Sequence, residues 1–135
     1  MPREALEKLL PYTDTFLADI KAIDEDVHIA CTGVSNKRIL DNLHWLDTAG
    51  ASIEIRYPCV PGMNDDQVER IAAFLHTLHS VKRVRVIPYH NYAERKYRCL
   101  GKNYPLTDVP VPDQTFIQTI LKRFHQCGIL NAETF

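Results

Sequence analysis

Three stretches of the chain alternate apolar and polar residues with the two-residue period of a β-strand. They are residues 15–21 (TFLADIK), 52–57 (SIEIRY) and 83–90 (RVRVIPYH). Side chains two positions apart in a strand point to the same face, so each stretch presents one apolar and one polar side. Each therefore predicts a strand that buries one face against a hydrophobic core.

A helical period follows each of these predicted strands. Residues 36–49, 65–79 and 113–127 place apolar side chains three and four positions apart, as an amphipathic helix does, and residues 1–10 show the same pattern. Three strand–helix units in succession predict an α/β fold with a parallel sheet and right-handed crossovers. Their spacing fits either a β/α barrel or an open doubly wound sheet, and both bind ligands at the carboxyl ends of the strands.

The ends of the predicted helices carry capping signals. Ser35 is suited to capping the first of them and Gly50 to ending it. Asn64, with Gln67 three residues later, resembles a capping box for the second. We interpret the TGVSN segment before the first helix as a turn in a loop, because it has no lysine and second glycine of a phosphate-binding loop.

Ionisable side chains gather where the predicted strands end. Asp19 and Lys21 share one face of the first strand, Arg56 lies at the end of the second, and His90 at the end of the third. Taken singly, Asp19 and Lys21 can be a structural ion pair, Arg56 a structural arginine and His90 a surface histidine. Parallel strands bring their carboxyl ends to one edge of the sheet, so the three ends together predict a ligand site.

Five segments carry a resemblance to a known family. DIK, HIACTGVSN, IRYPCVPGMND, VIPYH and KYRCLG occur in this order. The set resembles the activating enzymes of glycyl radical enzymes, which belong to the radical S-adenosylmethionine enzymes. The resemblance runs from about Thr13 to the end of the last predicted helix. It implies a partial (β/α)6 TIM-like barrel, of which residues 1–135 would be a single partial domain, the C-terminal half.

The resemblance also implies a reaction. In this family a [4Fe-4S] cluster, held by three cysteines in C-x-x-x-C-x-x-C, reductively cleaves S-adenosylmethionine. The resulting 5′-deoxyadenosyl radical takes a hydrogen from a backbone glycine of a partner such as pyruvate formate-lyase. We therefore expect a fragment of such an activase, an oxidoreductase, with a glycyl radical enzyme as its partner.

By this resemblance four residues would bind the cofactor. Asp19 and Lys21 would lie beside the methionine part of S-adenosylmethionine, with Lys21 bonded to its carboxylate. Asp19 would hold the amino group or a monovalent cation, and Leu17 would offer its backbone carbonyl to that cation. Arg56 would lie deeper in the barrel, and His90 at the adenosine end. The resemblance gives none of these residues a catalytic role.

One departure from the family is large. The four cysteines lie far apart and form no C-x-x-x-C-x-x-C, so we expect no iron–sulfur ligands in this chain: Cys31, Cys59, Cys99 and Cys127. We expect the cluster-binding N-terminal half to be absent and the isolated chain to be inactive. The alternative interpretation is a catalytically silent half-barrel that serves as a binding or assembly module.

Composition narrows the remaining possibilities. The formal net charge of -1 gives no general attraction to nucleic acid, although residues 82–102 are locally basic and contain tyrosines. We interpret that segment as a solvated loop. No apolar run approaches the roughly 20 residues of a membrane helix, and we expect a cytoplasmic protein with reduced thiols. The two unpaired edges of a half-barrel predict a homo-oligomer.

Overall fold

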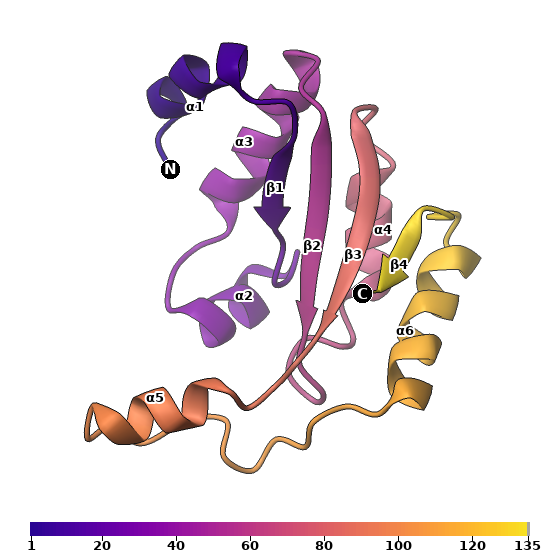
Figure 1. Cartoon of the computed structure of the whole chain (residues 1–135). Helices are drawn as coiled ribbons and strands as arrows, with labels where there is room; N and C mark the ends of the chain where they lie inside the picture. Colours follow the sequence, from indigo (N-terminus) through magenta and orange to yellow (C-terminus); the bar gives the residue numbers. More distant parts are fainter. Residues whose placement is uncertain (135) are drawn as a thin grey trace.

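The computed structural model describes residues 1–134, and its centre is one parallel sheet with the strand order β1-β2-β3-β4 (Figure 1). The strands are β1 (Phe16–Asp19), β2 (Ile53–Cys59), β3 (Val81–Pro88) and β4 (Ala132–Thr134). Each strand pairs in parallel with the one before it in the sequence. The predicted parallel sheet is therefore confirmed, and it has one strand more than the sequence patterns indicated.

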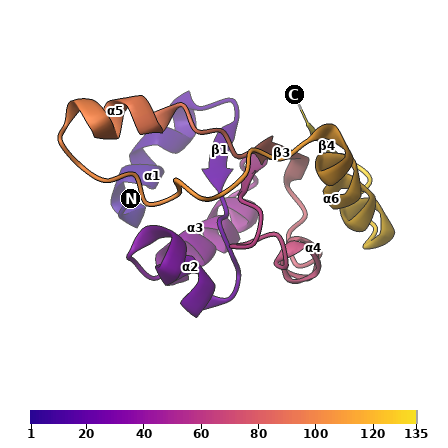
Figure 2. The same ribbon diagram turned by 90° about the horizontal axis from the view of Figure 1, so that it is seen from below.

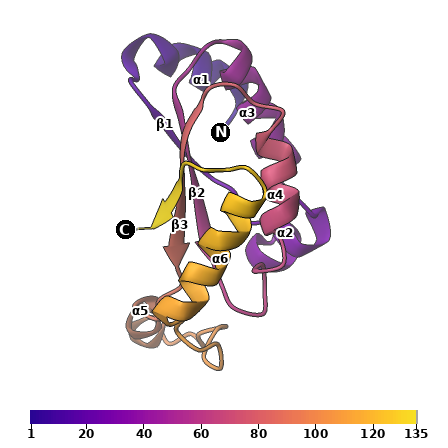
Figure 3. The same cartoon turned by 90° about the vertical axis from the view of Figure 1, so that its right-hand side faces the viewer.

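The long helices lie on a single face of this sheet, as the side view shows (Figure 3). The helices are α1 (Arg3–Leu9), α2 (Glu25–Thr32), α3 (Lys37–Thr48), α4 (Val68–Leu75), α5 (Ala93–Cys99) and α6 (Gln114–Gln126), with a 3₁₀ turn η1 (Leu10–Tyr12). A doubly wound sheet has helices on both faces, whereas a barrel has them only outside. Sequential strand order with one-sided helices is the arrangement of an arc of a β/α barrel.

The core lies between the sheet and the helices. Along β2, buried residues alternate with partly exposed ones, so that Ile53, Ile55 and Tyr57 face the helices with no exposed surface. Tyr57 meets Phe124 of α6 edge to face, with ring centroids 5.8 Å apart. Burying side chains of this size contributes about 1.5–3 kcal/mol each, so this layer provides most of the stability of the domain.

Three elements differ from the sequence expectation. Residues around TGVSN are not one loop, because α2 precedes them: the Asp24 carboxylate accepts the N–H groups of Asp26 and Val27 at 3.1 and 3.3 Å, and Gly33 ends the helix at φ 77°. α5 and β4 are likewise additional. β4 has only three residues and α5 buries none of its side chains, so periodicity alone gives little sign of either.

The expected capping box at Asn64 and Gln67 is wrong. α4 begins only at Val68, and the side chains of both residues are buried and bonded to other segments instead. The expected cap at Ser35 lies one residue too early, because Asn36 precedes α3 and makes no side-chain capping bond, although the Ser35 hydroxyl accepts the N–H of Lys37 at 3.2 Å. Among residues 1–134, no helix combines the length and apolar character that crossing a bilayer requires.

Candidate functional site

The sheet face opposite the helices, which we call the open face, carries the predicted ionisable residues. Alternation along β2 turns Arg56 away from the buried Ile55 and Tyr57. The register pairs Asp19 with Arg56, and Arg56 with Arg85 of β3. Lys21 follows the end of β1. The strands thus bring side chains from distant parts of the sequence onto one surface.

Asp19, Lys21 and Arg56 form a single ionic cluster. Asp19 Oδ2 lies 2.9 Å from Lys21 Nζ, and its Oδ1 lies 2.7 Å from both Nε and Nη2 of Arg56. The three side chains are 37%, 30% and 38% exposed, so each ion pair contributes little to stability. One carboxylate between two cations leaves a surplus positive charge that an anionic group can neutralise.

A second ionic cluster on the open face was missed by the sequence analysis. Arg85 and Arg83 both contact Glu54 of β2, at 3.3 and 3.9 Å, and both contact Glu133 of β4, at 3.1 and 3.0 Å. The alternating polar residues along β2 and β3 could have indicated that Glu54, Arg83 and Arg85 share a face. Glu133 could not have been placed with them, because its strand was not predicted. These contacts fix the short β4 to its neighbour.

His90 lies apart from the Asp19 cluster. It is exposed beyond the end of β3, where its ring stacks on Tyr92 with centroids 4.3 Å apart. Within the described part of the chain, no hydrogen bond or ion pair joins His90 to Asp19, Lys21 or Arg56. Its predicted role at the adenosine end of a ligand stays a prediction.

Leu17 lies on the free edge of β1. The N–H groups of Phe16 and Ile20 donate to Ser52 and Arg56 of the neighbouring strand, both at 2.9 Å. Backbone groups alternate sides along a strand, so those of Leu17 and Asp19 point away from β2. A carbonyl with this orientation is available to a cation, although residues 1–134 contain no group of three His, Cys, Asp or Glu side chains arranged for a metal ion.

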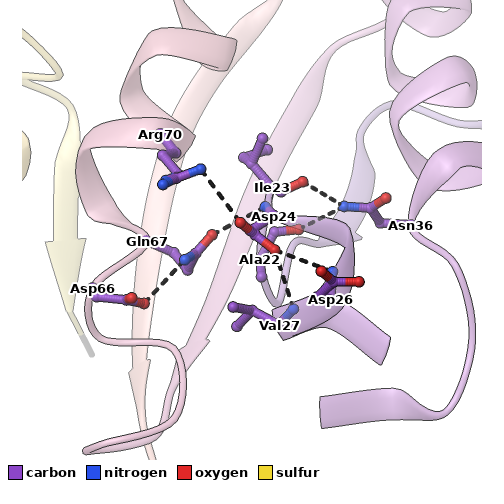
Figure 4. Close-up of polar contacts among 9 residues, drawn as sticks. All are labelled: Ala22, Ile23, Asp24, Asp26, Val27, Asn36, Asp66, Gln67 and Arg70. Carbon is purple, nitrogen blue, oxygen red and sulfur yellow. Dashed lines mark hydrogen bonds and ion pairs between the residues drawn. The ribbon is translucent and has the colours of Figure 1, made fainter. Parts of the chain in front are cut away.

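Buried amides hold the segment that follows β1, as Figure 4 shows for two of them. Asn36 Nδ2 donates to the carbonyls of Ala22 and Ile23 at 3.1 and 2.8 Å, and Gln67 Oε1 accepts the N–H of Asp24 at 3.1 Å. Asn64 Nδ2 donates to the carbonyl of Lys21 at 2.7 Å. Two other segments of the chain, the residue before α3 and the loop between β2 and α4, thereby set the position of Lys21.

His28 of α2 is a buried histidine without a hydrogen-bond partner. Its side chain is 1% exposed, and neither ring nitrogen has a partner. Burial is the main cause that lowers the pKa of His28, and the charge of the nearby Lys21 lowers it further, against the opposing effect of the Glu25 carboxylate. The imidazole is therefore held in its neutral form close to the ionic cluster.

Replacing His28 by Leu is expected to reduce the dependence of stability on pH. The folded pKa lies below the unfolded value of about 6.5, so as the pH falls below that value the unfolded chain takes up a proton that the folded chain does not. The free energy of unfolding of the wild type therefore falls between pH 7.5 and 5.5, and that of H28L falls less. Urea denaturation at both pH values measures the difference.

Exposed His44 provides the control for this prediction. H44Q removes a histidine from the surface of α3 and should keep the wild-type pH slope. At pH 7.5, H28L should be as stable as the wild type or more so, because it replaces a polar ring whose bonds are unmade. An H28L slope equal to that of the wild type would contradict the role given to His28.

The cysteines do not fit an iron–sulfur cluster. Cys31 lies in α2, Cys59 ends β2, Cys99 ends α5 and Cys127 follows α6, and all four are free thiols. Burial raises the pKa of Cys59 to about 11, which disfavours the thiolate that iron requires. The Asp19 cluster, in contrast, offers charges of both signs, and this donor set fits a ligand with a carboxylate and an ammonium group, such as S-adenosylmethionine.

Comparison with known proteins finds relatives of this chain in one superfamily of enzymes. Residues 1–75 match the Radical SAM superfamily. The chain is 38% identical to a pyruvate formate-lyase-activating enzyme of Streptococcus mutans, over 90% of this chain and 47% of that protein. It is also 38% identical to a trans-4-hydroxy-L-proline dehydratase activating enzyme of Clostridioides difficile, over 96% of this chain and 44% of that protein.

A solved structure shares the fold. A domain of a pyruvate-formate lyase-activating enzyme from Bacteroides vulgatus superposes with a TM-score of 0.79 at 21% sequence identity, covering 99% of this chain and 74% of that one. The chain spans about half the length of the curated relatives it matches.

Proposed function

The chain belongs to the radical S-adenosylmethionine superfamily, and on this premise we propose that it is the C-terminal, cofactor-binding part of an activase that generates a glycyl radical on a partner enzyme. The observation that carries the proposal is the similarity to two such activating enzymes over at least 90% of the chain. The Asp19 cluster on the open face supports it, because its charges suit the zwitterionic end of S-adenosylmethionine.

Each charged residue of the Asp19 cluster would bind one of the two charged groups of that ligand. Lys21 and Arg56 offer charge-assisted hydrogen bonds to a carboxylate, and Asp19 accepts a hydrogen bond from an ammonium group. His90 and Tyr92 offer an aromatic surface near the end of β3, where an adenine can stack. When bound, S-adenosylmethionine would supply hydrogen-abstracting chemistry only on receiving one electron from a cluster held outside these residues, which would cleave it to methionine and a 5′-deoxyadenosyl radical.

The isolated chain is expected to be inactive in this reaction. Its four cysteines lie on four different elements and are too dispersed to hold the cluster that delivers the electron. After anaerobic incubation with iron, sulfide and a reductant, the chain should bind no stoichiometric iron and form no 5′-deoxyadenosine. Detection of 5′-deoxyadenosine by chromatography would contradict this expectation.

A chimera tests the proposed function. The part of the Streptococcus mutans relative that this chain does not match is fused to residues 1–135, and the purified protein is reconstituted with iron and sulfide. The proposal expects 5′-deoxyadenosine to form and a glycyl radical signal to appear on pyruvate formate-lyase by electron paramagnetic resonance. A soluble chimera that holds a full cluster but forms no 5′-deoxyadenosine would overturn it.

A silent binding module is the second candidate, favoured by the missing cluster ligands among the described residues. The mass of the native protein in its source cells, by immunoblot, discriminates between the two. A band near twice 15.5 kDa supports the activase, and a band at 15.5 kDa supports the module. The homo-oligomer expected from the two unpaired edges of the sheet, at β1 and β4, stays a prediction.

A further inference from the structure

Helix α2 is attached to the rest of the chain at few points. It lies at the carboxyl end of the sheet, beside the end of β1 (Figure 1), and on the same side of the sheet as α3 (Figure 2). Of its eight described residues, His28 alone is buried, and the others are exposed or partly buried. An isolated helix of this length is not stable in water, so α2 persists only while it stays docked.

Among the residues that the structure describes, the polar bonds that join α2 to other elements lie at its start. The N–H of Asp24, which caps the helix, donates to Gln67 Oε1 at 3.1 Å, and the Asp24 carboxylate lies 3.4 Å from Arg70 Nη1 (Figure 4). The Glu25 carboxylate accepts the hydroxyl of Ser35, which belongs to the loop that follows α2 itself. Beyond the first turn, the docking of α2 therefore depends on the burial of His28.

The imidazole of His28 fits its buried place only in the uncharged form. The side chain is 1% exposed, and neither ring nitrogen has a partner. Two charged groups act on the ring, Lys21 of the segment after β1 and Glu25 of α2 itself. Glu25 is exposed and already bonded to Ser35, so an imidazolium would be buried near a lysine with no acceptor for its two N–H groups. Such a charge is costly, and burial accordingly lowers the pKa of His28.

Lys21 links α2 to the Asp19 cluster. Its ammonium lies 2.9 Å from Asp19 Oδ2 on the open face. The charge of Lys21 also acts on Cys31, one helical turn after His28, where it opposes the rise in the thiol pKa that burial causes. Only residues 22–24 separate Lys21 from the start of α2. A displacement of α2 therefore changes the surroundings of Lys21.

We propose that His28 is a positioning residue for Lys21. While the imidazole is uncharged, it keeps α2 docked near Lys21, and its protonation in acid opens α2 and leaves Lys21 without its helical neighbour. In treating Lys21 as a residue that binds the ligand, the inference rests on the proposed function. The opening itself needs no ligand, so it can be measured on residues 1–135 alone.

Amide hydrogen exchange at pH 7.5 and 5.5 tests the opening. The reporters are the N–H groups of His28 and Gly33, which donate to the carbonyls of Asp24 and Ile29 at 2.9 and 2.7 Å. The opened form takes up a proton with the ordinary histidine pKa of about 6.5, whereas the docked form does not. Opening should therefore be about tenfold more favourable at pH 5.5, and the protection of both amides, corrected for the intrinsic effect of pH on exchange, about tenfold lower.

Two variants that cannot take up this proton should behave differently. In H28L and H28Q, the protection of the same two amides should fall less than about twofold between the two pH values. H28Q covers the case in which leucine alters the packing of α2. H44Q, which removes an exposed histidine from α3, is the control and should show the tenfold fall of the wild type.

The N–H of Ile53 in β2, which donates to the carbonyl of Ser80 at 3.1 Å, is the internal reference and should exchange more slowly than the α2 amides at both pH values. Equal falls in the wild type, H28L and H28Q would overturn the proposal. Exchange of the α2 amides at the rate of Ile53 would also overturn it, because α2 would then open only when the whole chain unfolds.

Nuclear magnetic resonance of the His28 ring tests the link to Lys21. Its titration midpoint should lie below about 6.5 in the wild type. K21M should raise the midpoint because it removes a nearby positive charge, whereas K37M, at the exposed start of α3, should not. An unchanged midpoint in K21M would overturn the role given to Lys21. Neither measurement needs a cluster or S-adenosylmethionine, so failure here leaves the chimera experiment untouched, and failure of the chimera leaves the opening of α2 in place.

Discussion

Replacing Asp19 by Asn is expected to lower 5′-deoxyadenosine formation by the chimera about 100-fold. The Asp19 carboxylate lies between Lys21 and Arg56, and it is the one anion in that cluster. Its amide replacement leaves the two cations without a counter-charge and gives no charged partner to the ammonium group of the ligand. Hydrogen bonds to charged groups contribute about 1.5–3 kcal/mol, which supports a loss of this size.

The same substitution should change stability little. Asp19 is more than a third exposed, so its ion pairs contribute at most about 1 kcal/mol in total to the folded state. Chromatographic assay of 5′-deoxyadenosine and urea denaturation of the same preparation measure both quantities. D41N, on the exposed side of α3, is the matched control and should retain full activity. An active D19N chimera would remove Asp19 from the proposed ligand site.

Asn64→Ala is expected to destabilise the chain by about 2–4 kcal/mol. The Asn64 side chain accepts the N–H of Val60 at 2.7 Å and donates to the carbonyls of Lys21 and Pro58 at 2.7 and 2.9 Å. The residue is 1% exposed, so its loss leaves backbone groups buried without partners. The midpoint of urea denaturation should fall accordingly.

Exposed Asn103 serves as the comparison, since N103A removes an asparagine from the surface of the connection between α5 and α6. N103A should keep the wild-type midpoint within experimental error. If N64A is equally stable, the link between the end of β1 and the loop after β2 contributes little, and the position of Lys21 has another cause.

The sequence predicted the central strands of the sheet better than the short elements β4 and α5. Alternation in residues 52–57 indicated β2 and the outward direction of Arg56, because that strand buries every second residue completely. Asp19, Lys21 and Arg56 were expected at one edge and do lie together. β4 has three residues, and α5 buries none of its side chains, so neither leaves a periodic pattern to detect.

The rest of the candidate site depends on register. Glu54, Arg83, Arg85 and Glu133 contact one another only because particular residues face each other across the strands. The residues that face each other across neighbouring strands cannot be read from the sequence alone. The capping-box interpretation of Asn64 and Gln67 failed for a related reason: both residues have the right spacing for a local bond, yet their side chains bond to segments more than forty residues away.

The sequential order of the strands has a consequence for how the chain is made. Each strand after β1 is added beside the strand that precedes it in the sequence, so during synthesis the partner to which it adds has already been made. The sheet can therefore grow by one strand–helix unit at a time. The connection between paired strands is a single unit long, which limits the entropy lost when the two strands come together. Growth proceeds from β1 towards β4, and the outer edge of β1 remains the place where any strand made earlier would be added.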